Sequence, residues 1–450
     1  MTKPKTLASN ITNTLDVVHL LPLMEDASKA QAFENTVGVH LLFVPSDLGG
    51  RLTVGFGRTH ASPDHVLAVL DPDGVVHRPD VSGRVRIDLS RGKRGHGMFF
   101  ATVHAKSGKY SVFALFEEVG FARDKDGSHL IPWNFWYWPF ADSKKPQTAW
   151  GSDFMFPLSH YEKAFKVKGA KVRKWEKEHH NDPTKSRASW EGHCHNSAPA
   201  SILFQAPPDT GKTHAGVDFS CEEIKFYATE FFGRFGELDF VWGLPGTGPM
   251  GRTGPLQENR PSDDPKLFGT NRRALADFLE MLRREVRDRG RALVMDLRDS
   301  SGSAHEEVWN QAVYQYATRY WQADPTDPML TEGVTVLFAN DDFLADGGAS
   351  SGLPAEIVTV HGEAQANPSG LGREQRCRFR LRFESSGQVD ASAKDNRWWS
   401  MKVGSTKIHA PRFAWRVKKP LATEKSSSSG NPHIGRAETL TLLPLRTKFA

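Results

Sequence analysis

The residues best suited to carry out chemistry lie around Cys194, a lone cysteine set among polar and small side chains. A mostly apolar run over residues 200–204 follows it. This arrangement is typical of a reactive thiol in the first turn of a buried helix, where backbone N–H groups without intrahelical partners favour a thiolate. Pro199 fits only if the helix begins close by, because proline breaks a helix beyond its first turn. The alternative is a small buried cysteine in a core element, the more common role of a cysteine outside disulfides.

Length and composition limit the class of protein. A chain of 450 residues with 38% hydrophobic residues predicts a globular protein of two or three domains. No window approaches the ~18 consecutive apolar residues that a membrane helix needs. The lysines of residues 1–5 precede no apolar stretch, so we expect no secretory signal. These features predict a cytoplasmic protein, or one exported without a classical signal peptide.

Cysteine spacing, acidic residues and net charge argue against several kinds of site. The three cysteines lie far apart, which predicts neither a disulfide framework nor a zinc site and suits a reducing compartment. No loop of alternating acids typical of calcium proteins is present in the sequence, so we expect no obligatory metal and no cofactor. A net charge of +5 is low for a nucleic-acid-binding protein of this length, and we expect no such partner.

The N-terminal part reads as a series of short strands. Val85, Ile87 and Leu89 alternate with polar residues, as in a strand with one face toward water. Residues 71–74 (DPDG) form a typical turn. Strands at this spacing without intervening helices predict an N-terminal β-sandwich over residues 1–125. Its expected role is binding or scaffolding, and the sequence does not identify its partner.

Three further segments each allow two interpretations. The aromatic residues 131–140 are more typical of core than of a substrate slot. Residues 206–213 (APPDTGKT) match a relaxed phosphate-loop pattern, but two prolines remove N–H donors and a polar run follows, so we do not expect nucleotide binding. In residues 376–383, four arginines alternate with apolar residues, which predicts a strand whose cationic face is solvated rather than a groove for an acidic substrate. We also expect the lysine-rich residues 161–180 to be exposed.

The remaining segments predict helices and strands in alternation. Ser220 and Glu223 have the spacing of a capping box, and an amphipathic helix follows them. A second helix is expected from about Leu275 to Gly290, and residues 291–297 then read as a buried strand that carries Asp296. Residues 307–316 are ambiguous between helix and strand, and we favour strand. Residues 421–450, which include four consecutive serines, predict a flexible linker and tail.

Several sequence blocks, taken in order, point to one family. They are Trp138-Pro139, Trp190 with Cys194-His195, and residues 198–200, 294–296, 308–311, 380–387 and 409–415. In these blocks the chain, from about residue 133 to residue 420, resembles the transglutaminase elicitor family. The resemblance implies an α+β fold with a papain- or transglutaminase-like catalytic domain, which we assign to residues 126–420. In that fold a helix-mounted cysteine faces a sheet that supplies a histidine and an acid.

The chemistry implied by this resemblance is acyl transfer. The Cys194 thiolate attacks a glutamine carboxamide, ammonia leaves, and a lysine amine resolves the thioester. The expected partners are therefore a protein or peptide glutamine donor and an amine acceptor. Asp296 orients the base, and the backbone N–H of Cys194 with a neighbouring polar side chain holds the oxyanion, an interaction of typically ~3 kcal/mol. The residues expected to line the substrate site are Trp190, His195, Trp309 and Asn310.

The catalytic base is the point at which this sequence departs from the family pattern. Arg272 occupies the position of the family histidine, and arginine stays protonated. His305, in the turn after Asp296, is one substitute, and His193 or His195 beside the cysteine is another. A shifted alignment across the preceding Gly/Pro-rich loop also stays open, and so does a catalytically silent relative. Among the imidazoles we select His305 as the base.

Two classes of function therefore remain. The first is a cysteine-dependent acyltransferase, with a cysteine amidase or peptidase as its close variant, because transamidation and hydrolysis share the thioester and differ only in what resolves it. The second is a binding protein that keeps the transglutaminase-like fold without its chemistry. The sequence does not separate them.

Overall fold

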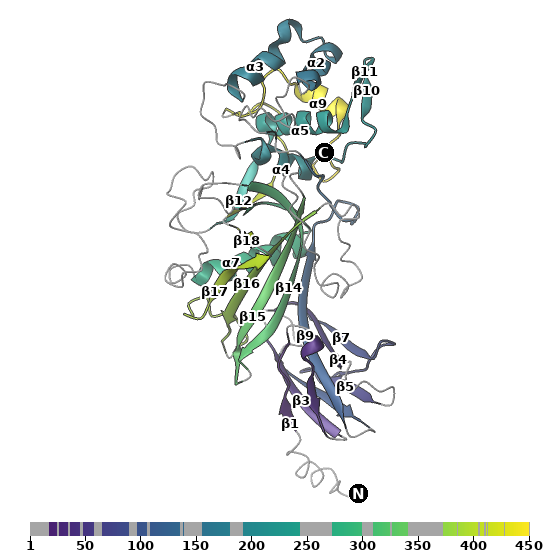
Figure 1. Cartoon of the computed structure of the whole chain (residues 1–450), viewed down its shortest axis with the longest axis vertical. Coiled ribbons are helices and arrows are strands. Elements are labelled where there is room, and N and C mark those ends of the chain that lie inside the picture. Colours follow the sequence, from purple (N-terminus) through teal and green to yellow (C-terminus); the bar gives the residue numbers. More distant parts are fainter. Residues whose placement is uncertain are drawn as a thin grey trace, which may run out of the picture.

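The computed structural model has an α+β architecture, with most helices gathered at one end of an elongated molecule (Figure 1). The strands of the first hundred residues lie at the opposite end. The residues described are 18–24, 27–34, 37–45, 48–57, 65–89, 97–105, 109–135, 138, 155–180, 192–243, 272–298, 309–324, 326–340, 372–384, 386–403, 406–408, 411, 413–426 and 428–449.

One long strand, β14 (Trp309–Asp324), joins the two ends of the molecule. Along one edge, its first residues pair with β13 (Leu293–Arg298) and residues 315–320 pair with β9 (Tyr110–Phe121). Along its other edge it pairs with β15 (Asp327–Asn340). The strand assignment that we favoured for residues 307–316 is therefore confirmed from Trp309 onward.

These strands belong to a 12-stranded sheet, whose main path runs β12-β19-β13-β14-β15-β16-β17-β18. Strands β2, β4 and β7 extend it through β9. Besides β9, β13, β14 and β15, the strands of this sheet are β12 (Leu238–Gly243), β19 (Phe413–Val417), β16 (Gly372–Arg382), β17 (Arg397–Val403), β18 (Thr406–Ile408), β2 (Gln31–Phe33), β4 (Gly50–Phe56) and β7 (Arg84–Leu89). The predicted alternation in β7 is confirmed, because Val85, Ile87 and Leu89 are buried while Arg86 and Asp88 are exposed.

A five-stranded sheet with the order β1-β3-β8-β5-β6 covers the N-terminal strands of the large sheet. Its strands are β1 (Val18–Leu20), β3 (Val37–Val44), β8 (Gly97–His104), β5 (Val66–Leu70) and β6 (Val76–His77), with a short 3-10 helix η2 (Ala27–Lys29) beside them. Leu42 and Val69 of this sheet share one apolar core with Val54 and Val112 of the large sheet. Strand pairing also crosses the boundary expected at residue 125, since β9 continues the large sheet through β14. A separate β-sandwich domain stays a prediction.

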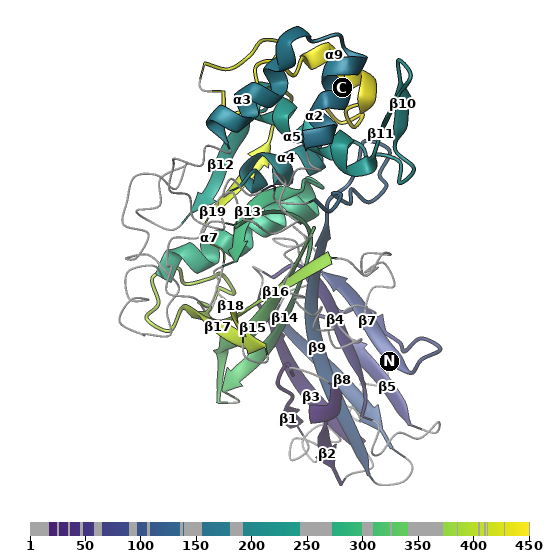
Figure 2. The same ribbon diagram turned by 45° about the horizontal axis from the view of Figure 1, so that its top comes forward.

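Helices cover both faces of the sheet around β13 (Figure 2). Val294 packs in the same apolar cluster as helices α4 (Cys194–Leu203) and α5 (Cys221–Phe235). Leu293 and Met295 point the other way, into the cluster that contains helix α7 (Arg272–Leu282). This alternation follows from the two-residue period of a strand. Burying one such aliphatic side chain stabilises the fold by about 1.5–3 kcal/mol.

The helical end contains α2 (Met155–Ala164), the 3-10 helix η5 (Lys168–Ala170), α3 (Lys171–His179) and α9 (Arg436–Leu442), with the hairpin β10 (Lys212–His214) and β11 (Val217–Phe219). The predicted capping box opens α5: Ser220 accepts the backbone N–H of Glu223, whose carboxylate accepts that of Ser220. The phosphate-loop-like segment leads into a strand at Lys212 rather than a helix, as the sequence indicated.

The C-terminal residues correct one prediction. A flexible linker and tail was expected over residues 421–450, but the structure packs this segment against the helical end. The backbone N–H of Ser429 donates to the carbonyl of Gly233 in α5 at 3.1 Å, and Asn431 and Ile434 are fully buried. The serine-rich composition suggested flexibility, but the buried residues that follow it hold the segment in place.

A buried carboxylate stabilises the junction between β9, β14 and the π-helical turn η6 (Arg283–Asp288). Glu118 accepts hydrogen bonds from Arg283 at 2.9 Å, Arg287 at 2.8 Å and the Tyr316 hydroxyl at 2.6 Å. Burial raises the pKa of the Tyr316 phenol well above its ordinary value, and the carboxylate of Glu118 raises it further. Gly120 leaves room for the Tyr316 ring, which a Cβ atom at that position would meet.

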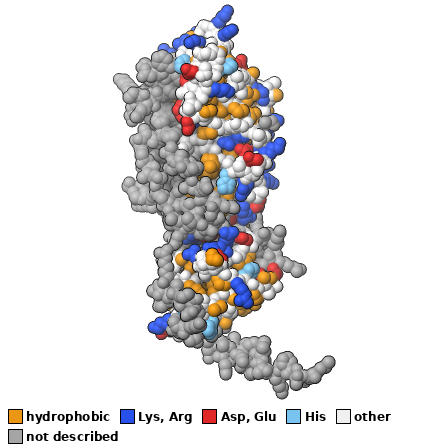
Figure 3. Space-filling view, turned by 90° about the vertical axis from the view of Figure 1, so that its right-hand side faces the viewer, with side chains coloured by type: hydrophobic (Ala, Val, Ile, Leu, Met, Phe, Trp, Pro, Cys, Tyr) orange, Lys and Arg blue, Asp and Glu red, His pale blue; other side chains and the backbone are white. Residues whose placement is uncertain are grey.

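Of the four arginines predicted to form a cationic face on β16, Arg380 and Arg382 have described side chains, and both are held in ion pairs, as on an ordinary surface. Arg380 pairs with Glu332, and Arg382 pairs with Asp327 at 3.0 Å and with Asp395 at 2.7 Å. On a different face of the molecule, shown in Figure 3, Lys and Arg side chains lie scattered among hydrophobic and acidic ones. Among the described residues, no helix combines the length and apolar character required to cross a membrane.

Candidate active site at Cys194

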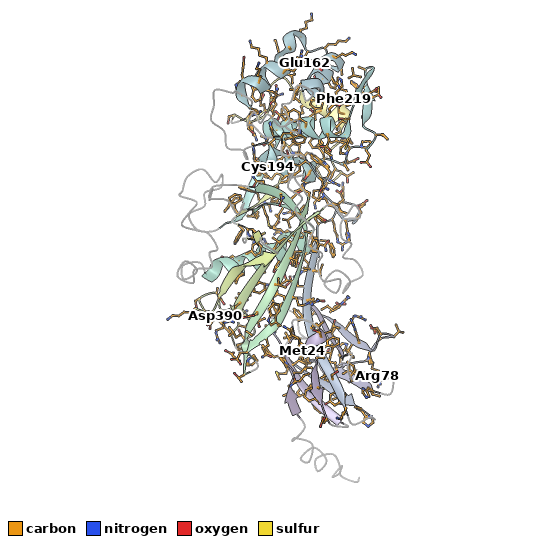
Figure 4. The ribbon with its side chains drawn as sticks, viewed as in Figure 1. Met24, Arg78, Glu162, Cys194, Phe219 and Asp390 are labelled. Carbon is orange, nitrogen blue, oxygen red and sulfur yellow. The ribbon has the colours of Figure 1, made fainter. Side chains whose placement is uncertain are left out.

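Cys194 is the first residue of α4 and lies where the helical end meets the large sheet (Figure 4). Its side chain is 4% exposed and packs in the same apolar cluster as Val294 of β13 and Ala312 of β14. The predicted position at the start of a buried helix is therefore confirmed. The burial is also what a small core cysteine would show, so position alone does not decide its reactivity.

The sequence of α4 suits a helix surrounded by protein. Every residue of the helix except His195 is buried, and its alanines and serines allow close approach to its neighbours. Pro199 is the sixth residue rather than part of the first turn, which corrects the position expected for it. Because proline has no N–H group, it cannot donate to the carbonyl oxygen of His195, one turn earlier.

Asn340, at the end of β15, fixes α4 against the sheet. Its side-chain N–H groups donate to the Ser201 hydroxyl of α4 at 3.1 Å and to the carbonyl oxygen of Trp133 at 2.9 Å. Its amide oxygen accepts the backbone N–H of Ala312 in β14 at 2.7 Å. One fully buried side chain therefore connects the helix that carries Cys194 to the strand that carries Asn310.

His193 precedes Cys194 and is completely buried. Its backbone N–H donates to the carbonyl oxygen of Trp138 at 3.3 Å, and Trp138 has a φ of 42°, a strained value for a bulky residue. Burial, with the neighbouring His180, lowers the pKa of His193 well below its ordinary value. Its imidazole is therefore neutral at physiological pH and weakly basic.

His195 is the one residue of α4 whose side chain reaches solvent. In its neutral form, the Nδ1–H group donates to the carbonyl oxygen of Gly192 at 3.2 Å. Partial burial of the ring lowers the pKa of His195, and His193 and His180 contribute to that shift. The lowered pKa makes this imidazole a weaker acceptor for the proton of a thiol.

The sheet beside α4 holds part of the predicted site. The backbone of Asp296 in β13 pairs with that of Asn310 in β14, and Arg298 pairs with Trp309 after a register shift. Asp296 stands two positions after Val294, which packs in the cluster containing Cys194. The side chain of Asn310 is 5% exposed, and no described residue donates a hydrogen bond to its amide oxygen.

Other predicted residues lie outside the part of the chain that the structure describes. They are His305, Trp190, and the side chains of Asp296, Trp309 and Arg272. The structure therefore brings together the helix of Cys194, the side chain of Asn310 and the backbone position of Asp296.

The structure adds a cluster of four residues that the sequence analysis did not group. Glu176 of α3, its C-cap residue His180, His193 and Glu230 of α5 are all buried, with potential ligand atoms within 4.8 Å of one another. The prediction of an exposed segment over residues 161–180 is wrong for Glu176 and His180. Glu176 and His180 are four residues apart and so lie on one face of a helix. This spacing was the signal in the sequence that the two side chains could act together.

No protein-family model matches the chain, and no curated protein matches it. The structure is similar to the crystal structure of the GP42 transglutaminase from Phytophthora sojae, with 16% sequence identity, a TM-score of 0.43, and coverage of 72% of this chain and 90% of that chain. It is also similar to PliG from Aeromonas hydrophila, a periplasmic lysozyme inhibitor of g-type lysozyme, with 15% identity, a TM-score of 0.15, and coverage of 21% and 96%. Both likenesses are weak.

Proposed function

We propose that this protein transfers the acyl group of a glutamine side chain to an amine through a thioester on Cys194. The observation that supports the proposal best is the position of Cys194 at the start of a buried helix, packed against the sheet strands that carry Asp296 and Asn310. Backbone N–H groups at a helix N-terminus favour a thiolate over a thiol. The sequence resemblance to transglutaminase elicitors supplies the reaction class.

The proposed reaction has two steps that share one intermediate. In the first, the Cys194 thiolate attacks the carboxamide carbon, the C–N bond breaks, and ammonia leaves after the nitrogen takes a proton from the catalytic acid. In the second, an amine attacks the thioester, gives a proton to the same group acting as base, and releases the thiolate. The N–H groups at the start of α4 would hold the oxyanion, an interaction worth about 3 kcal/mol.

His305 is the proposed acid and base. His193 and His195 are weaker candidates because their lowered pKa values make both of them poor proton acceptors. Asp296 would orient the imidazole, and the buried amide oxygen of Asn310 offers a second acceptor for its N–H group. The pH–rate profile tests this assignment: His305→Gln should abolish turnover, whereas His195→Gln should leave the profile unchanged.

Amine incorporation tests the proposed reaction directly. A fluorescent primary amine and a glutamine-rich protein donor are incubated with the wild type, Cys194→Ala and Cys221→Ala, while ammonia is measured in parallel. Cys221 is a matched control, because it is also a thiol at the first position of a helix. We expect incorporation by the wild type and Cys221→Ala, and none by Cys194→Ala.

The same assay separates the competing functions. Ammonia release without incorporation, lost in Cys194→Ala, would identify a cysteine amidase. If the folded wild-type protein gives neither amine incorporation nor ammonia release, the enzyme proposal fails and the binding-protein alternative stands.

A further inference from the structure

Four side chains with metal-binding atoms meet in the interior of the helical end. They are Glu176, His180, His193 and Glu230, and each is at most 9% exposed. Nδ1 of His180 lies 2.7 Å from Oε2 of Glu176, and Nδ1 of His193 lies 3.0 Å from Oε1 of Glu230. The two imidazole rings stand perpendicular, with centroids 4.5 Å apart. Donor atoms around a tetrahedral zinc ion are about 3.4 Å apart, given bonds of about 2.1 Å, so the cluster is already near that spacing.

Asn431 orients both carboxylates from outside the cluster. Its backbone N–H donates to Oε2 of Glu230 at 2.6 Å, and its side-chain N–H donates to Oε1 of Glu176 at 2.9 Å. In each carboxylate the other oxygen is then the one beside an imidazole nitrogen. Outer-shell hydrogen bonds of this kind typically fix the orientation of metal ligands.

The charges of the cluster suit a divalent cation. Glu176 and Glu230 place two carboxylates together in the protein interior, where burying like charges side by side is costly unless a cation balances them. His180 and His193 add two imidazoles, the most common metal-binding side chains, within the same cluster. A cation of charge +2 would balance two ionised carboxylates and remove the cost of burying them.

We propose that Glu176, His180, His193 and Glu230 bind one divalent transition-metal ion, with zinc as the best fit. Two imidazoles and two carboxylates are a typical tetrahedral donor set for zinc, whereas calcium and magnesium prefer oxygen ligands alone. The sequence analysis predicted no metal because these residues come from three separate segments of the chain, and the four-residue spacing of Glu176 and His180 alone does not indicate a metal site.

The site would connect the helices around Cys194. Glu176 and His180 belong to the end of α3, Glu230 to α5, and His193 is the N-cap residue of α4 directly before the cysteine. A bound ion would therefore hold the N-terminal end of α4 against two other helices. The proposal does not depend on acyl transfer, because a binding protein would gain the same stabilisation.

Metal analysis of the full chain, purified without a histidine tag, tests the proposal. After removal of metals with a chelator, the protein is titrated with zinc and its content is measured by plasma mass spectrometry. We expect one zinc per wild-type chain and less than about a tenth of that in His180→Gln and Glu230→Gln, since losing a ligand weakens a four-ligand site severely. His179→Gln is the matched control on the same helix, because His179 stacks on Trp175 outside the cluster and should leave zinc binding unchanged.

Two results would overturn the proposal. One is folded wild-type protein that takes up no zinc, and the other is equal zinc content in the wild type and both ligand variants. If the variants do not fold, the visible spectrum of cobalt-substituted wild-type protein tests the metal site instead. Intense four-coordinate bands would support the site, and a weak spectrum of six-coordinate aqua cobalt would overturn it.

Discussion

The side chain of Asn340, on the last residue of β15, donates to the Ser201 hydroxyl of α4 over 3.1 Å. The same amide also accepts the Ala312 N–H of β14 and donates to the Trp133 carbonyl, so it connects three segments around Cys194. The position of α4 relative to the sheet therefore depends on a residue far from the cysteine in sequence.

Replacing Asn340 should destabilise the protein. Asn340→Ala leaves buried polar partners without hydrogen bonds, and we expect a loss of about 2–4 kcal/mol in the free energy of unfolding. Ser201→Ala removes only one of these bonds and should cost about 1 kcal/mol. Urea denaturation of the two variants measures the difference. Equal losses in both would show that Asn340 does not anchor the helix.

The buried carboxylate of Glu118 gives a second stability test. Glu118→Gln removes the negative charge that Arg283 and Arg287 face, and leaves Arg283 buried without a counter-charge. We expect a loss of about 3–5 kcal/mol in the free energy of unfolding. The control is Glu34→Gln, since both members of the pair of Glu34 with Lys109 are exposed and the pair should contribute less than about 1 kcal/mol. A similar small effect in both variants would contradict the prediction.

The two helix-start thiols should differ in the pH at which they react. Burial raises the pKa of the Cys221 thiol, with Glu222 adding to the shift and Lys225 opposing it. Because only the thiolate is alkylated, the reaction of Cys221 with iodoacetamide should rise only at alkaline pH. If Cys194 is an activated nucleophile, its alkylation should have a midpoint below the ordinary value of about 8.5. Peptide mass spectrometry resolves the two sites, and a Cys194 midpoint at or above that of Cys221 would argue against activation.

Asn431 should tune the proposed metal site without binding the ion itself. Asn431→Ala removes the hydrogen bond from its side chain to Glu176 and frees the local backbone, so zinc affinity should fall by about 10- to 100-fold. Asn196→Ala is the control, because the side chain of Asn196 contacts the same C-terminal segment through Ser429, and only its backbone N–H, which the substitution keeps, contacts His193. Isothermal titration with zinc measures both. An unchanged affinity in Asn431→Ala would remove this residue from the site.

Local patterns predicted local structure well. The capping box of Ser220 and Glu223 was visible because both partners lie within four residues and satisfy the same helix end. The start of α4 at Cys194 was visible for a similar reason, since small polar residues precede an apolar run. In the aromatic residues 131–140, the described aromatic side chains of Trp133, Phe135 and Trp138 are buried, as expected for core.

Features that depend on contacts between distant segments were not visible in the sequence. His193 meets Glu230 through the packing of two helices, which no spacing rule reports. The pairing of β9 with β14 joins strands about two hundred residues apart, so the sequence suggested a domain boundary where the sheet is continuous. The buried Asn431 was hidden by the serines before it, whose composition suggested a flexible linker.

The shared edge of β14 has a consequence for any fragment of this chain. A fragment starting at residue 126 would lack β9, and residues 315–320 of β14 would then present unpaired N–H and C=O groups along an open strand edge. Exposed edges of that kind recruit strands from other molecules. The N-terminal residues, which carry none of the proposed chemistry, therefore protect this edge of β14. We expect a fragment without them to self-associate.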